Sequence, residues 1–407
     1  MDRRLLLRTG LAAVAGSAIS GAVWAAEPDH DATYVGDFDE LWETLRDRYC
    51  FFSEKRTDWN RVRALYRPLA RSADSDDAFA EVLRRTLAEL YDPHTSLANP
   101  PAGSQRLPIS DLITEWRNGQ AVVTALDSNG VAAEAGLALG DVIMSTDGRP
   151  IAPLVQDLLP KCLIRPDPAA QAYALNSAVA GLRGQPRRYL LATGAAEPRE
   201  VVLPIRQSPP QPNVEWRRLD DGAGYVAIRS FADDAVTESF DQALMELRDA
   251  PGLIIDVRNN GGGDTAVARP IMGRFITETK PYARMRRREG EGLGEFWTET
   301  VEPRGPFTYT RPIVVLTNHW SGSMAEGFPM GMRGLGRATI VGTPMMGLGA
   351  AVFTFRLDRK GIQGQYSAEP VYDVKDQPRW LMQPDVSVPD GEDILAAGRR
   401  VLAAATA

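Results

Sequence analysis

Short apolar runs that alternate with helical segments are the strongest constraint on the fold of this chain. The runs GLIIDV (252–257), RPIVVLT (311–317) and ATIVGT (338–343) are typical of buried strands. The segments ESFDQALMELRDA (238–250) and TAVARPIMGRFIT (265–277) carry helical patterns between them. Because buried strands separated by helices pack in layers, we expect an α/β unit, which we assign to residues 207–407.

A helical region is expected over residues 34–103. The segment DFDELWETLRDRYCFF (37–52) repeats apolar residues at intervals of three and four, and DAFAEVLRRTLAELY (77–91) does the same. Such stripes predict helices that pack against one another. The polar turn DPHTSL (92–97), with Pro93, ends the second helix.

Two motifs mark the segment over residues 104–206, AAEAGLALGDVI (132–143) and DGRPI (147–151), whose Asp-Gly pair predicts a hairpin turn. On these motifs the segment resembles a PDZ domain of the kind attached to bacterial proteases. A glycine-rich loop that would capture a peptide carboxylate is not evident in LPISDLITEWRNGQ (107–120). A PDZ-like fold is therefore expected, whereas peptide capture by strand addition stays open.

The first 25 residues are interpreted as an export signal. Arg3 and Arg4 precede the apolar stretch 11–25, which ends in small residues and resembles a twin-arginine signal. The stretch is too short and too rich in Ala, Gly and Ser for a good membrane span. We therefore expect cleavage after Ala25 and a soluble mature protein in the periplasm or outside the cell.

Composition gives no support for nucleic acid, a metal ion or a cofactor as a partner. The net charge of −7 gives no reason to expect nucleic acid, and the basic stretch 282–292 is interpreted as a solvated loop. Three histidines and two cysteines show no metal-ligand spacing, so neither a metal nor a cofactor is expected. Cys50 and Cys162 could pair in an oxidising compartment, but the sequence does not show that they meet.

Two segments of the α/β unit carry candidate chemistry. DVRNNGGGD (256–264) ends a buried strand in glycines, and VVLTNHWSGSMAEG (314–327) leads from a strand through serines into a helix. A hydroxyl on Ser323 would lie at a helix N-terminus, where a developing oxyanion is stabilised. The oxyanion donors would be the backbone N–H of Met324 and that of Gly262 or Gly263.

Another interpretation of the same serine is structural. Ser323 to Glu326 reads S-x-x-E, a capping box in which the serine only caps the helix. Ser321 is a weaker competitor for the role of nucleophile. The segment is not a G-x-S-x-G elbow, so an α/β-hydrolase is not supported.

Together these segments resemble the S41 peptidases, the C-terminal processing, tail-specific and tricorn-core proteases. The resemblance covers most of the chain and implies a ClpP/crotonase-like catalytic core with Ser323 as the nucleophile. The processing proteases use a lysine in a Gly-Lys-Gly stretch, but the corresponding MMGLGA (345–350) carries Leu348 there. A leucine cannot accept a proton, so a Ser–Lys dyad is not expected.

The resemblance to tricorn-type members points to His94 as the base instead. Those members carry a histidine at the end of the helical region, preceded by a serine where this chain has Pro93. Neutral imidazole can accept the proton of a serine near pH 7. His319 is the second candidate.

A carboxylate is expected to orient the histidine. Glu369 is the first candidate for this role, followed by Asp376 and Asp92.

The sequence therefore predicts an exported serine endopeptidase that acts on peptides or unfolded protein tails. The alternative is a catalytically inactive family member that binds peptides in the cell envelope, and an esterase would use the same serine. The oligomeric state and the cleavage preference are open.

Overall fold

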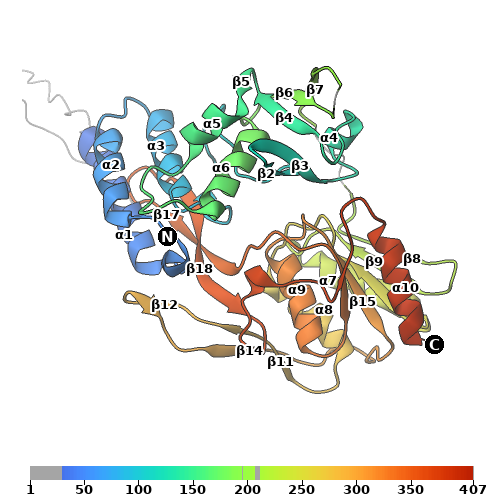
Figure 1. Ribbon diagram of the computed structural model, residues 1–407. Coiled ribbons are helices and arrows are strands. Elements are labelled where there is room, and N and C mark those ends of the chain that lie inside the picture. The colour runs from blue at the N-terminus through green and yellow to red at the C-terminus, as the bar shows by residue number, and fades with distance from the viewer. Residues whose placement is uncertain (1–29, 195, 207–210, 407) are drawn as a thin grey trace, which may run out of the picture.

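The computed structural model describes residues 30–194, 196–206 and 211–406, and the signal expected over residues 1–25 lies outside these ranges. Figure 1 shows three regions, a helical one in blue, a mainly β one in green and an α/β one in yellow to red. None of the described helices is long and apolar enough to cross a membrane.

A six-stranded sheet forms the centre of the α/β region. Its order is β19-β16-β15-β10-β9-β8, and only the pair β8–β9 is antiparallel. The strands are β8 (Val214–Arg218), β9 (Gly224–Ile228), β10 (Leu253–Asp256), β15 (Ile313–Thr317), β16 (Thr339–Gly342) and β19 (Val386–Ser387).

Helices cover both faces of this sheet, as a parallel sheet requires. Ile255 and Val315 face a cluster that includes residues of α7 (Ala235–Glu246), α8 (Thr265–Met272) and α9 (Met324–Gly334). On the other face, their neighbours in the strands pack against α10 (Ile394–Thr406). The alternation explains why these strands are apolar at almost every position.

A second sheet ties the helical region to the C-terminal part of the chain. Its order is β1-β18-β11-β14, with β17 also paired to β18. The strands are β1 (Ser96–Leu97), β11 (Lys280–Met285), β14 (Trp297–Val301), β17 (Ala350–Arg356) and β18 (Gln363–Tyr372). Helices α1 (His30–Arg48), α2 (Trp59–Arg71) and α3 (Asp76–Ala88) share a buried cluster with Phe355 and Tyr366 of this sheet.

Residues 104–206, which are expected to be PDZ-like and are called the PDZ-like region below, form a six-stranded antiparallel sheet with its own buried cluster. Asp147 and Gly148 both have positive φ and form the expected turn between β4 and β5. The elements are β2 (Leu112–Arg117), β3 (Gln120–Leu126), α4 (Val131–Glu134), β4 (Val142–Thr146), β5 (Arg149–Pro150), α5 (Ile151–Leu158), α6 (Pro168–Ala180), β6 (Arg187–Ala192) and β7 (Arg199–Leu203).

Two expectations about single segments are settled by the structure. The basic stretch 282–292 is not a loop, because it continues β11 into the hairpin of β12 (Arg288–Glu289) and β13 (Gly292–Leu293). Its arginines lie over aromatic rings, for example Arg286 over Phe296, and this stacking keeps the segment ordered. Both cysteines are buried and unpaired.

Candidate active site

The two segments that carry the candidate chemistry meet at one edge of the central sheet. Strands β10 and β15 are parallel neighbours, with Ile254 opposite Val314. Their carboxyl ends therefore lie side by side, and the turns that follow them come together. Gly322 donates its N–H to the carbonyl oxygen of Asn260 at 2.9 Å, which fixes the serine turn against the glycine turn.

Ser323 occupies the junction between the turn after β15 and helix α9. Its backbone has φ +54° and ψ −116°, a sparsely populated conformation for a residue with a side chain. Such strain persists only where the surroundings fix it, and it is concentrated at functional sites. Ser323 also lines a cavity of about 450 Å³ together with Met324 and Gly263.

Glu326 holds this junction in place. Its carboxylate accepts hydrogen bonds from the backbone N–H groups of Ser323 (2.8 Å), Gly347 (2.7 Å) and Leu348 (2.9 Å). Burial raises the pKa of Glu326, and the charge of Arg379 and the three N–H groups oppose that effect. The half of the capping box that Glu326 supplies is thus present, whereas the Ser323 hydroxyl makes no capping hydrogen bond. The cap does not compete with a catalytic role, because it leaves the hydroxyl of Ser323 uncommitted while the residue lines the cavity.

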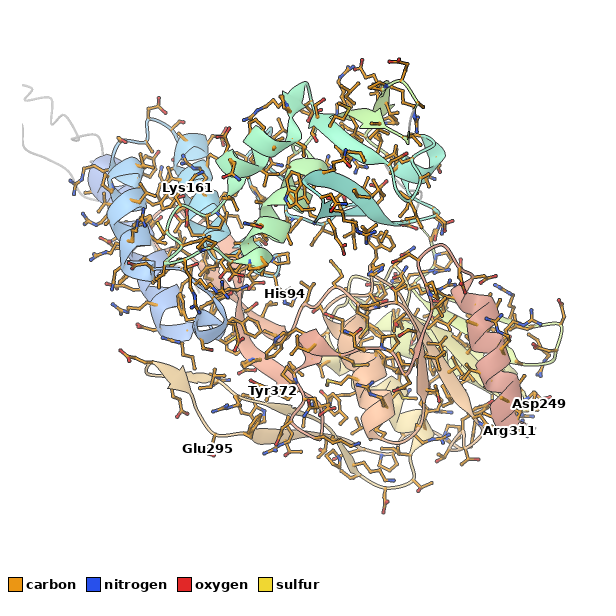
Figure 2. All side chains as sticks on the ribbon, viewed as in Figure 1. His94, Lys161, Asp249, Glu295, Arg311 and Tyr372 are labelled. Carbon is orange, nitrogen blue, oxygen red and sulfur yellow. The ribbon has the colours of Figure 1, made fainter. Side chains whose placement is uncertain are left out.

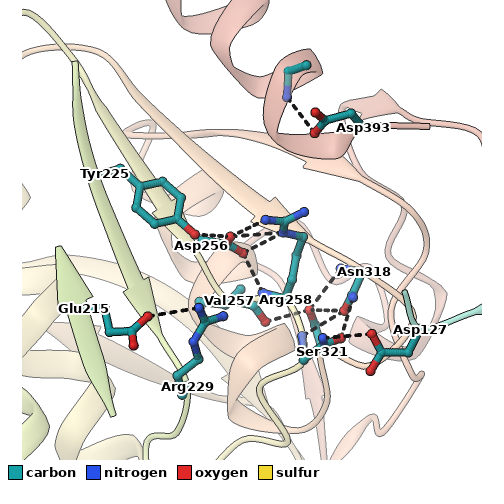
Figure 3. Close-up of polar contacts among 12 residues, drawn as sticks. Asp127, Glu215, Tyr225, Arg229, Asp256, Val257, Arg258, Asn318, Ser321 and Asp393 are labelled. Carbon is teal, nitrogen blue, oxygen red and sulfur yellow. Dashed lines mark hydrogen bonds and ion pairs between the residues drawn. The ribbon is translucent and has the colours of Figure 1, made fainter. Parts of the chain in front are cut away.

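Ser321 has a structural role. It is fully buried, its Oγ donates to the carbonyl oxygen of Val257 at 2.8 Å, and the N–H of Asn318 donates to it at 3.0 Å (Figure 3). The hydroxyl therefore ties the end of β15 to the end of β10. A hydroxyl held in this way is not exposed to a substrate.

Gly262 packs directly against Ser323, the candidate nucleophile. With φ +109°, a Cβ at this position would lie 2.7 Å from the Cβ of Ser323 and 2.9 Å from the nitrogen of Met324. Any larger residue would therefore push into the space where an oxyanion forms. The N–H of Gly262 donates to Oδ1 of the buried Asn260 at 2.8 Å, so this donor is already used.

Gly263 is the glycine that can serve as the second oxyanion donor. Within the described parts of the chain, its N–H and that of Met324 have no hydrogen-bond partner. Both residues line the cavity with Ser323. Since Met324 is the first residue of α9, the partial positive charge of the helix N-terminus adds to the stabilisation of an anion there.

His94 lies in the turn between α3 and β1, between the helical region and the core (Figure 2). Its side chain is buried, and its Nδ1 has no hydrogen-bond partner among the described residues. Burial lowers the pKa of His94 to about 4, with Asp92 opposing and Arg379 adding to the shift. The imidazole is therefore neutral at pH 7.

The structure does not join His94 to Ser323 by a hydrogen bond within the ranges it describes, and His94 is not among the residues that line the cavity. The two sides are nevertheless linked. Ser367 donates to Asp92, two residues before His94, and in the sheet Ser367 is opposite Val352, which lines the cavity. The turn that carries His94 is thus connected to the strands β17 and β18, which contribute to one wall of the cavity.

The three carboxylates proposed to orient the histidine have other partners. Glu369 pairs with Arg287, and Asp376 pairs with Arg284. Asp92 lies beside His94 and accepts from its backbone N–H at 3.0 Å, not from its ring. Spacing along the chain could not predict the pairing of Glu369 and Asp376, because their arginine partners lie 82 and 92 residues earlier, in or just after β11.

The second histidine belongs to a different cavity. His319 Nε2 lies 2.9 Å from Asp390 Oδ1, and both residues line a cavity of about 430 Å³ between the core and residues 126–129 of the PDZ-like region. Ser323 does not contribute to that cavity. Although His319 is near Ser323 in sequence, its ring is engaged elsewhere.

Leu348 takes up space next to the serine turn. Its side chain is buried, and its Cδ1 lies 3.2 Å from the position that a Cβ on Gly322 would occupy. The position at which the resemblance leads one to expect a lysine is therefore occupied by a buried apolar side chain.

A further residue of the cavity was not singled out from the sequence. Arg379 lines the cavity with Ser323 and is almost completely buried. It stands alone in the stretch DQPRW, with no periodicity or paired charge to mark it, and only the fold brings it to the site.

Comparison with known proteins gives matches in sequence and in structure. Residues 222–388 match the model of peptidase family S41, and residues 30–88 match that of the Tricorn protease C1 domain. The carboxyl-terminal-processing protease of Synechocystis sp. is 26% identical over 344 residues, which cover 79% of this chain and 73% of that protein.

Two solved structures share the fold. The photosystem II D1 C-terminal processing protease superposes with a TM-score of 0.56 at 20% identity, covering 92% of this chain and 97% of that one. Mature CPAF complexed with lactacystin gives 0.61 at 16% identity, covering 92% and 98%. These likenesses concern the fold alone. They confirm the expected α/β core with N-terminal helices.

Proposed function

The chain belongs to peptidase family S41, a family of serine peptidases, and we propose that it is an exported endopeptidase that cleaves peptides or unfolded protein tails. The observation that carries the proposal is the arrangement of Ser323, Met324 and Gly263 around one cavity. Ser323 Oγ attacks the carbonyl carbon of the scissile bond. The N–H groups of Met324 and Gly263 then stabilise the oxyanion.

We assign the role of base to His94. The neutral imidazole takes the proton of Ser323 as the hydroxyl attacks, and returns it to the leaving amine. Catalytic hydrogen bonds often tighten only when substrate binds, and the turn of His94 is held by β1 and β18, whose sheet lines the cavity. A base with a pKa of about 4 is unprotonated at neutral pH and can therefore accept a proton. It is, however, a weaker base than an imidazole with the ordinary pKa of 6.5.

Two features favour a second candidate, a peptide-binding protein without catalysis. The lysine site is filled by Leu348, and the ring of His94 makes no hydrogen bond within the described residues. If no base reaches Ser323, the cavity still binds peptides but does not cleave them.

Hydrolysis of matched substrates separates the candidates. We expect the mature chain, residues 26–407, to cleave an unfolded protein and both the amide and the ester of one short peptide. Hydrolysis of the ester alone would indicate an esterase. Peptide binding without turnover of either substrate would identify the binding protein and contradict the proposal.

We also propose that the protein is exported, on the support of the paired arginines near its start. Replacing Arg3 and Arg4 with lysine should leave the unprocessed chain in the cytoplasm, as fractionation and immunoblotting would show. Unchanged export of the double variant would count against a twin-arginine route.

A further inference from the structure

A buried arginine forms part of the wall beside the nucleophile. Arg379 begins the short helix η3 (Arg379–Leu381) and is only 6% exposed. Its Nη2 donates to the carbonyl oxygens of Leu348 (2.5 Å) and Ala350 (3.1 Å). The neighbouring Trp380 packs against Tyr372 at the end of β18. These contacts fix the guanidinium in one position.

Much of the donor capacity of Arg379 is unused. Its Nε is buried and has no hydrogen-bond partner in the described part of the chain. Nη1 also has no hydrogen-bond partner among the described residues, but unlike Nε it is partly accessible to solvent. A Cβ on Gly327, which lines the same cavity, would lie 3.3 Å from Nη1, so this nitrogen is at the cavity wall.

The nearby acidic groups do not use these donors. Glu326 directs its carboxylate to the N–H groups of three residues of the serine turn and the loop beside it. Asp264, also in the cavity wall, is exposed and accepts from the N–H of Ala266. Burial lowers the pKa of Arg379 although Glu326 and Tyr282 oppose the shift. An arginine stays charged even so.

The charge of Glu326 compensates part of the charge of this buried arginine, but the unused N–H groups still lack an acceptor, which is costly unless a ligand supplies one. We propose that the cavity beside Ser323 binds a carboxylate of the peptide substrate, which pairs with the guanidinium of Arg379. The inference rests on the proposed function, and it specifies the substrates as peptides that present a carboxylate to this cavity. Apolar residues of the same wall, Met330, Val352 and Val371, would contact the aliphatic part of the bound residue.

Two carboxylates of a peptide have this chemistry, an acidic side chain and the free C-terminus. Binding to the Ser323→Ala protein, which cannot turn over substrate, distinguishes them. Fluorescence anisotropy would compare one labelled peptide containing an internal Glu with its Gln version, and one ending in a free acid with its C-terminal amide.

We expect the acid to bind at least about tenfold more tightly than its neutral match in one of these pairs, because charge-assisted hydrogen bonds are the strong ones. A preference for Glu assigns the site to a side chain, and a preference for the free acid assigns it to the C-terminus. When Arg379→Met is combined with Ser323→Ala, the preference for the acidic peptide should disappear. Arg379→Lys in the same background should keep part of that preference.

The matched control is Arg399→Met, which removes a surface arginine paired with Asp221 and should leave the preference unchanged. Equal affinity within both peptide pairs would overturn the inference, even if Arg379→Met fails to fold. Cleavage by the wild type without a charge preference would refute the inference alone. A charge preference without cleavage would refute the proposed endopeptidase and leave the carboxylate site standing.

Discussion

Replacing Ser323 with alanine is expected to lower kcat for peptide hydrolysis by at least about a thousandfold while the protein stays folded. The substitution removes the atom that bonds to the substrate carbon, and the remaining oxyanion donors cannot form a covalent intermediate. The backbone hydrogen bonds of the serine turn do not need the hydroxyl, because Glu326 accepts from the N–H of residue 323. Initial rates and circular dichroism would measure the two quantities.

Ser321→Ala is the matched control. This variant loses the bonds to Val257 and Asn318, so we expect lower thermal stability but retained turnover in the folded fraction. A Ser323→Ala protein that keeps more than a tenth of wild-type kcat would show that another group attacks the substrate.

Replacing His94 with alanine is expected to lower kcat/KM by about 10² to 10⁴, the usual range for loss of a general base. The pH dependence carries more information. The base works only when it is neutral, so activity should be level from pH 8 to about pH 5 and fall as protons bind near pH 4. The His94→Ala protein should lack this acid limb.

Stability has to be followed in the same pH range. The folded protein holds the pKa of His94 at about 4, below the ordinary value of 6.5, so the unfolded chain binds the proton more readily. The stabilisation that comes from neutral His94 is complete above pH 6.5 and is lost as the pH falls toward 4. Rates should therefore be corrected for the folded fraction at each pH.

The control for this prediction is His319→Ala, which removes the contact with Asp390 in the other cavity. We expect hydrolysis and its acid limb to be unchanged. The assignment of His94 would be wrong if His94→Ala kept full activity, or if His319→Ala abolished it.

The core of the fold could be predicted from sequence because the residue patterns that indicate its strands and helices lie within single short segments. Strands β10 and β15 are apolar at nearly every position, since both faces of the sheet are buried, and the turns that carry the glycines and serines follow a few residues after each strand. Ser323 could be singled out for the same reason, as it stands between a strand and a helix. The register of neighbouring parallel strands then brings the two turns together.

The residues that sequence analysis missed or left open depend on contacts between distant segments. The N–H of Gly262 is used by Asn260, which leaves Gly263 as the donor, and the choice between adjacent glycines follows from side-chain geometry alone. Glu369 pairs with Arg287, a residue that lies in an ordered hairpin where a loop was expected. Arg379 reaches the cavity through the packing of the C-terminal segment.

The most direct test of the account is covalent labelling of the mature protein with a fluorophosphonate, followed by mass spectrometry of the peptides. Such probes react with serines that an oxyanion hole and a base activate. We predict a single adduct on Ser323, absent from Ser323→Ala and strongly reduced in His94→Ala. An unlabelled, folded wild-type protein, or an adduct on another serine, would contradict the assignment of Ser323 as the nucleophile.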